Sequence, residues 1–189
     1  MSKCGRCRWA WACKKVWRAF AYFVVGWLPL AGQSHQLSIT TGYNYQNSDQ
    51  GKGLRANLSG WFSDLQYDLN EHLAITGEVD SYRGSLQGHI VRQENYVGGP
   101  QLTLRDEDAR IRPFFYIQTG DQRTSSAGSV SHSFNLQMGG GVELKLSSRV
   151  ALQVTPVEYN LATLEGATLA HSFGVKTGLI WIIWRPNKN

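Results

Sequence analysis

Cysteine is scarce in this chain of 189 residues. Its three cysteines, Cys4, Cys7 and Cys13, all precede an apolar run near the N-terminus. Cys4 and Cys7 have CxxC spacing, but no second cysteine pair completes a zinc or thioredoxin-like site. The remainder of the chain has no thiols or disulfides, so its stability must come from its fold.

Acidic residues are missing from the start of the chain, where the first is Asp49. Six basic residues precede it, so the formal net charge of +5 belongs to this leader and the rest of the chain is close to neutral. A basic surface for nucleic acid needs positive charge spread over the folded domain. We therefore expect no nucleic-acid partner.

Long hydrophobic runs are also missing. The run from Ala19 to Gly32 is shorter than the roughly 20 residues that a transmembrane helix needs. It follows a basic segment and precedes polar residues, which is typical of a secretory signal. The sequence predicts a signal peptide over 1–32, a folded domain over 36–185 and a polar tail over 186–189; the alternative for the leader is an uncleaved amphipathic anchor.

A sustained helical period is absent after Gln36, and segments with a period of two take its place. Between Phe134 and Leu146, for example, every second residue is apolar or glycine, which indicates a strand with one apolar and one polar face. Alternation alone does not say which face points inward. We predict eight strands, over 36–46, 55–69, 73–83, 94–104, 110–121, 132–146, 150–161 and 170–184.

The predicted connections alternate between short and long. Those at 70–72, 105–109 and 147–149 are short, and those at 47–54, 84–93 and 122–131 are longer and polar. Outer-membrane barrels have short turns on one side and longer external loops on the other. An even number of strands would place both chain ends on the short-turn side.

The last predicted strand has a second feature of these barrels. Lys176, Gly178, Trp181 and Ile183 follow the polar-x-Gly-x-x-aromatic-x-hydrophobic pattern that resembles an assembly signal. A buried strand of a soluble sandwich is the other interpretation. Many barrels with this pattern end at an aromatic residue. This chain departs from it, because residues 185–189 follow Trp184.

These segments together resemble small bacterial outer-membrane β-barrels of the porin-family or outer-membrane-protein-A-like type. The resemblance rests on 139–146, 149–152 and 158–163, and it extends over about 37–185. It implies an all-β, eight-stranded, antiparallel, up-and-down transmembrane barrel in the outer membrane, with no cofactor, no metal and no enzyme activity. It also implies two partners, outer-membrane lipid and the barrel assembly machinery, which would bind the last strand.

The two faces of the strands then have different expected roles. If the apolar face points outward, a polar network fills the interior; its expected members are Asp64, Glu78, Arg112, Glu143, Lys145, Glu158 and Lys176, with Asp80 and Arg110 beside them. Arg112 and Glu143 are one expected pair, and Glu158 and Lys176 are another. The expected lipid-facing or aromatic-girdle residues are Trp61, Tyr67, Phe134, Leu136, Val142, Leu144, Trp181 and Trp184, with the aromatic ones close to the short turns.

Several functions fit this pattern. A structural or surface-presenting barrel filled by side chains, a narrow diffusion porin and an exported, lipocalin-like ligand-binding barrel all remain open. A membrane-embedded acyl hydrolase would need serine and histidine together, yet His132 and His171 alternate with their neighbouring serines across strand faces. The histidines lack metal-ligand spacing. Pro156 would remove a ladder hydrogen bond, which predicts a bulge in the seventh strand.

Overall fold

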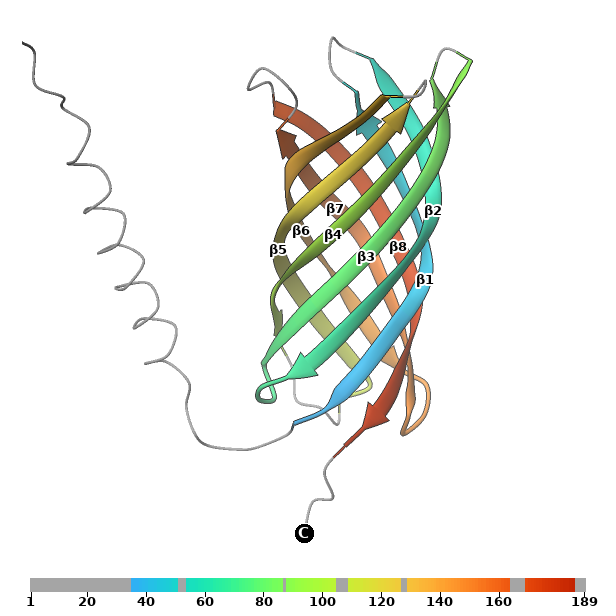
Figure 1. The fold of residues 1–189 in the computed structure, drawn as a ribbon. Coiled ribbons are helices and arrows are strands. Elements are labelled where there is room, and N and C mark those ends of the chain that lie inside the picture. The colour runs from blue at the N-terminus through green and yellow to red at the C-terminus, as the bar shows by residue number, and fades with distance from the viewer. Residues whose placement is uncertain are drawn as a thin grey trace, which may run out of the picture. The chain divides into compact units, whose positions relative to one another are not determined.

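The chain forms a closed antiparallel barrel in which each strand pairs with its neighbours in sequence (Figure 1). The computed structural model describes residues 35–50, 54–86, 88–104, 109–126, 129–163 and 169–185. The proposed signal peptide, the three cysteines and the tail at 186–189 lie outside this part. The strands are β1 (Leu37–Asp49), β2 (Arg55–Asp68), β3 (Leu73–Leu86), β4 (His89–Thr103), β5 (Ile111–Ser126), β6 (Ser129–Lys145), β7 (Val150–Thr163) and β8 (Leu169–Trp184).

The first and last strands close the barrel. β1 pairs with β8 in antiparallel register, with Leu37 opposite Trp184. The expected even number of strands is confirmed, and it brings the start of β1 and the end of β8 to the same end, here called the short-turn end. Closure pairs the backbone of both terminal strands, so neither is left as a free sheet edge.

The strands extend further from the short-turn end than the alternation predicts. β3 continues to Leu86 and β4 begins at His89, while β5 continues to Ser126 and β6 begins at Ser129. The predicted long connections at 84–93 and 122–131 are therefore wrong, because most of these residues pair in the ladder. Two residues separate the strands at each of these places, whereas seven separate β4 from β5 at the short-turn end. The expected alternation of short and long connections is thus not found.

Both faces of β5 are polar from Gln122 to Ser126, and Gly84 and Ser85 interrupt the pattern on β3. This hides the period of two, whereas backbone pairing does not depend on it.

The apolar faces of the strands point outward. On β6, Phe134 is 57% exposed while its neighbours Asn135 and Gln137 are fully buried. The same inversion occurs around the barrel: most buried side chains are polar or charged, and many large hydrophobic side chains are exposed. The period of two alone did not say which face of β6 points inward; in the structure it is the polar face.

β7 contains the expected bulge. Thr155 lies opposite Lys176 and Glu158 lies opposite Gly174, so β7 has one residue more than β8 between these pairs. The ladder with β6 shifts at the same place. The extra residue keeps Val154 and Val157 on the outer side while Thr155 and Glu158 are buried.

Among the described residues, no helix is long and apolar enough to cross a membrane.

Candidate functional site

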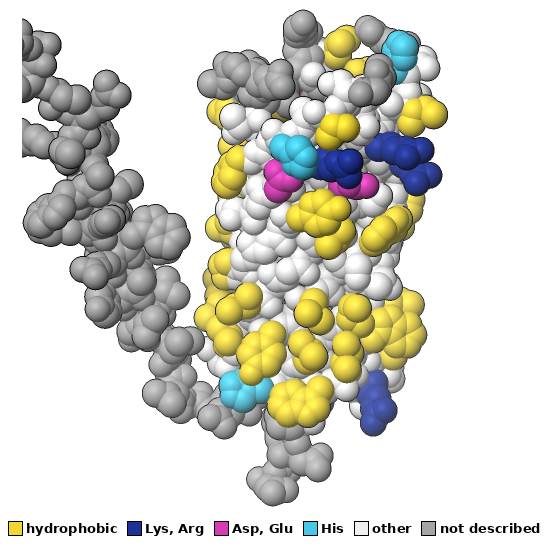
Figure 2. Space-filling model, viewed as in Figure 1, with side chains coloured by type: hydrophobic (Ala, Val, Ile, Leu, Met, Phe, Trp, Pro, Cys, Tyr) yellow, Lys and Arg dark blue, Asp and Glu magenta, His cyan; other side chains and the backbone are white. Residues whose placement is uncertain are grey.

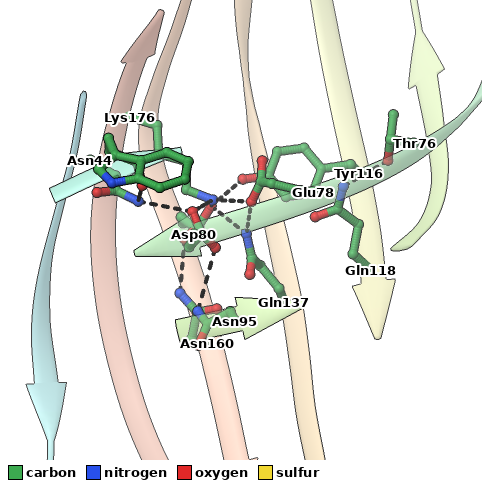
Figure 3. A network of polar contacts seen from close by, with 12 residues as sticks. Asn44, Thr76, Glu78, Asp80, Asn95, Tyr116, Gln118, Gln137, Asn160 and Lys176 are labelled. Carbon is green, nitrogen blue, oxygen red and sulfur yellow. Dashed lines mark hydrogen bonds and ion pairs between the residues drawn. The ribbon is translucent and has the colours of Figure 1, made fainter. Parts of the chain in front are cut away.

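The centre of the barrel interior, or lumen, holds a buried ion cluster around Lys176 of β8 (Figure 3). Its Nζ lies 3.0 Å from Asp80 Oδ1 and 2.7 Å from Glu158 Oε2, and it also contacts Glu78 Oε1. All four side chains are almost completely buried. We call Lys176, Glu78, Asp80 and Glu158 the lysine network.

The strand geometry brings these four residues together from different parts of the wall. Glu78 and Asp80 are two positions apart on β3, so both point into the lumen. Glu158 comes from β7, next to β8. Lys176 therefore joins its own side of the barrel to β3, with which β8 does not pair.

Side-chain amides also donate hydrogen bonds to these carboxylates, mostly to the oxygens that contact Lys176. Gln137 donates from Nε2 to Glu78 at 2.8 Å and to Glu158 at 2.9 Å. Asn44 donates to Asp80 at 2.9 Å, and Asn160 donates to Glu158 at 2.9 Å. A buried carboxylate needs such partners because it has lost water. The amides therefore connect the ion cluster to strands β1, β6 and β7 (Figure 3).

An aromatic ring lies beside the lysine network. Phe62 of β2 extends over the glycines that face it, Gly42 of β1 and Gly178 of β8, since a Cβ on either would lie within 3.0 Å of the ring. Lys176 Nζ is 5.4 Å from the centre of this ring, within cation–π range. The ring and the cation thus occupy the same level of the lumen.

A second ionic level lies toward the short-turn end. Arg112 of β5 and Glu143 of β6 are cross-strand neighbours, with Nη1 and Oε2 3.5 Å apart. Gln101 donates to Glu143 and to Gln66, each at 3.2 Å. Lys145 lines a small cavity beside Arg112 and Glu143. Contacts at this level thus connect strands β2, β4, β5 and β6.

The opposite end of the lumen contains an apolar level. Ala56, Leu58, Tyr82 and Val91 form a buried cluster, and Leu86 packs against it. These residues come from β2, β3 and β4. Side chains therefore meet inside the barrel at three levels: a salt bridge, the lysine network and an apolar cluster.

The structure places the expected interior residues as follows. Asp64, Glu78, Glu143, Glu158 and Lys176 are buried, while Arg112 and Lys145 are partly exposed. It joins Arg112 to Glu143 and Glu158 to Lys176. Asp64 Oδ2 is buried without a hydrogen-bond partner. Arg110 differs from the expectation: it precedes β5 and is exposed, because the inward alternation begins only within the strand.

The polar network also includes three amide residues that were not predicted from the sequence. Asn44, Gln101 and Gln137 make central contacts. Strand parity could have found them, because all three lie at inward positions. Tyr116 of β5 also faces the lumen and donates its hydroxyl to Glu158. Charged residues were predicted to fill the interior, whereas neutral amides at equivalent inward positions were left out.

The expected outer-face residues point outward. Phe134, Trp61, Tyr67, Trp181 and Trp184 are between 39% and 57% exposed, and Leu136, Val142 and Leu144 lie on the same outer face of β6. Tyr67, Trp181 and Trp184 lie toward the short-turn end. Trp61 does not: it is midway along β2, opposite Tyr43. Trp61 therefore faces outward as expected but is not close to a short turn; with Tyr43 it forms a second outward aromatic group further along the barrel.

Neither serine–histidine sequence forms a catalytic pair in the described part of the chain. His132 Nδ1 lies 2.8 Å from Asp121 Oδ2, while Ser133 donates to the carbonyl of Gln122. His171 contacts the Tyr159 hydroxyl, and Ser172 is buried in the lumen. Within the same residues, no group of three or more potential ligands could hold a metal ion.

Solved structures show the same fold at low sequence identity. Neisserial surface protein A is 16% identical with a TM-score of 0.66, covering 77% of this chain and 96% of that one. OprG from Pseudomonas aeruginosa is 10% identical with a TM-score of 0.55, covering 80% and 97%. Ail, the attachment invasion locus protein of Yersinia pestis, is 15% identical with a TM-score of 0.52, covering 79% and 100%.

These proteins resemble the chain in fold, which is that of small outer-membrane β-barrels. No protein-family profile and no curated protein sequence matches it.

Proposed function

We propose that this protein is a monomeric outer-membrane barrel whose lumen is closed by side chains, and that it serves as a structural or surface-presenting scaffold. The carrying observation is the inversion of the barrel, with ion pairs and amides inside and hydrophobic side chains outside. A soluble barrel in water would gain stability from the opposite arrangement. In a bilayer, outward hydrophobic side chains meet lipid instead.

The outer surface supports this placement. On the face shown in Figure 2, hydrophobic side chains gather toward the short-turn end, and charged and histidine side chains form a band further along. The strands have 13 to 17 residues, more than the roughly 9–11 that span a bilayer. We place the apolar region in lipid and the charged region beyond it, outside the cell.

The same arrangement supports a closed lumen more than a porin. Eight strands leave an interior that side chains can fill, whereas aqueous channels are found in barrels of about sixteen strands. Here the lysine network lies between the Arg112–Glu143 level and the apolar Leu58–Tyr82 level. A narrow porin remains the second candidate, because Arg112 and Lys145 line a cavity at one mouth.

We place the remaining alternatives lower. A lipocalin-like carrier would use an apolar lumen for its ligand, and an acyl hydrolase would use a serine beside a histidine. We further propose that 1–32 direct export and that the assembly machinery recognises β8. The proposal includes no cofactor and no nucleic acid. Specific interactions would fall to the connections at the end opposite the short-turn end, which face outside the cell.

Planar-bilayer recording tests the closed lumen. The protein is refolded in detergent, its barrel is verified by heat-modifiable gel migration and circular dichroism, and single insertions are recorded. We expect silence or rare small openings. Sustained, large, weakly selective conductance would establish a diffusion porin and end this proposal.

A matched variant keeps the recording informative. Leu58→Ala removes part of the apolar level but leaves the ion pairs intact. If the lumen is closed at several levels, the variant also stays silent. If Leu58 alone closes a conducting path, the variant conducts and the lysine network is not a barrier.

A further inference from the structure

Two arginines face each other on the outer surface, away from the short-turn end. Arg83 of β3 and Arg92 of β4 are direct cross-strand partners, and both side chains are exposed. Direct partners have Cβ atoms about 4.5–5.5 Å apart, so like charges there repel each other. We call these two residues the arginine pair.

Nearby acidic side chains are already engaged. Glu94 Oε2 lies 3.2 Å from Arg123 Nη1 and accepts a hydrogen bond from the Tyr96 hydroxyl. Asp121 contacts His132. In the described part of the chain, the arginine pair has no ion-pair partner, so this surface has an excess of positive charge. Figure 2 shows this band of charged side chains above the hydrophobic region.

The position of the pair along the barrel indicates the chemistry of its ligand. Tyr96, Glu94 and Arg92 follow one another on the outer side of β4, leading away from the short-turn end. Tyr96 is 48% exposed and belongs with the outward aromatic residues that typically lie where hydrocarbon meets headgroups. Arg92 and Arg83 therefore lie at the level of lipid headgroups or just beyond it.

We propose that the arginine pair binds the phosphate groups of lipids in the surrounding outer leaflet. Two guanidinium groups side by side can donate charge-assisted hydrogen bonds to one phosphate, whose negative charge also cancels their repulsion. Arg123 of the neighbouring strand β5 lies opposite Glu94 and is already paired with it, so Arg83 and Arg92 supply the free guanidinium groups. The inference rests on the proposed membrane location, because a barrel in water would meet no such lipid.

The test compares two environments with one double variant. Wild type, Arg83→Gln/Arg92→Gln and a control, Arg149→Gln, are refolded in phosphate-free maltoside micelles. Arg149 is an exposed arginine at the short-turn end, whereas the arginine pair lies toward the opposite end of the barrel. Urea unfolding is measured in these micelles and again with diphosphorylated lipid A added, with phosphate-free lipid A and inorganic phosphate as ligand controls.

We expect the effect of the double variant to change sign. In plain micelles it unfolds at a higher urea concentration than wild type, because the repulsion is gone. With diphosphorylated lipid A it unfolds at a lower concentration than wild type, and its affinity for that lipid is lower by about tenfold or more. Added salt weakens binding to wild type. Arg149→Gln behaves as wild type, and phosphate-free lipid A has no effect.

Three outcomes overturn the inference: equal lipid affinity in wild type and the double variant, equal loss in Arg149→Gln, or an equal effect of inorganic phosphate. The proposed function fails separately, if the wild-type chain does not fold into a heat-modifiable barrel or does not fractionate with the outer membrane.

Discussion

Tyr116 lies directly over Gly139. The two residues are cross-strand partners on β5 and β6, and a Cβ on Gly139 would be 2.4 Å from the Tyr116 hydroxyl oxygen. On its other side Gly139 is opposite Glu158 of β7, which accepts the hydrogen bond of Tyr116. The missing side chain thus lets one aromatic residue reach across a whole strand to the lysine network.

Replacing Gly139 with alanine should therefore destabilise the barrel. The added methyl group displaces the Tyr116 ring, and overpacking of this kind costs about 1–3 kcal/mol. Urea unfolding in micelles measures the change. The control is Gly77→Ala, because Gly77 faces outward and a Cβ there would meet nothing within 4 Å. We expect this control to be neutral or to stabilise by about 0.5–1 kcal/mol; equal effects of the two changes would contradict the role of Gly139.

Lys176→Met should destabilise the protein more. The change leaves Glu78, Asp80 and Glu158 buried without their shared cation, and removing one partner of a buried pair costs about 3–5 kcal/mol. Acidic pH should reduce the variant's loss of stability relative to wild type, since protonated carboxyls no longer repel one another. Arg123→Gln is the control: its salt bridge with Glu94 is exposed, and such a pair contributes about 0–1 kcal/mol.

Coupling between Lys176 and Glu158 can be measured by a double-mutant cycle with Met and Gln. Residues in one buried network usually couple by about 0.5–3 kcal/mol. A coupling near zero would mean that the 2.7 Å contact between these residues contributes no net stability. The energy of the network would then come from Glu78 and Asp80.

Strand parity explains how much of this arrangement could be predicted from the sequence. The alternation from Phe134 to Leu146 gives the two faces of β6, and the charges on the polar faces indicate a filled interior. Adjacent strands could also be paired, as for Arg112 with Glu143. These predictions need only local periodicity and chain order.

Contacts across the lumen could not be predicted in this way. Lys176 reaches Glu78 and Asp80 on β3, and neither parity nor chain order tells which wall a long side chain will meet. The extent of the strands was also hidden, because from Gln122 to Ser126 both faces of β5 are polar while the ladder continues. Both the contacts across the lumen and the length of the strands depend on how the barrel closes in three dimensions.

The depth of the outer face in lipid can be tested on one strand. Met138 and Leu146 lie on the same side of β6, Met138 opposite Ile117 and Tyr159 in mid-strand and Leu146 just beyond the strand's end. We expect Met138→Arg to cost about 2–4 kcal/mol in lipid and Leu146→Arg about 0–1, since arginine is costliest at the bilayer midplane. Equal costs, or labelling of a Met138→Cys variant by a water-soluble probe, would contradict a membrane-embedded β6.

The bulge at Pro156 predicts an unusual tolerance to deletion. Val154 and Val157 face outward and Thr155 and Glu158 face inward, so deleting Pro156 leaves a regular alternation with every neighbour on its present side. Deleting Gln137 from the regular part of β6 shifts the register by one residue and turns one segment of the strand inside out. We expect the Pro156 deletion to refold into a heat-modifiable barrel and the Gln137 deletion to fail. If the Pro156 deletion fails while Pro156→Ala folds, the extra residue itself is needed, and the bulge is then a required bend in β7 that a regular ladder cannot replace.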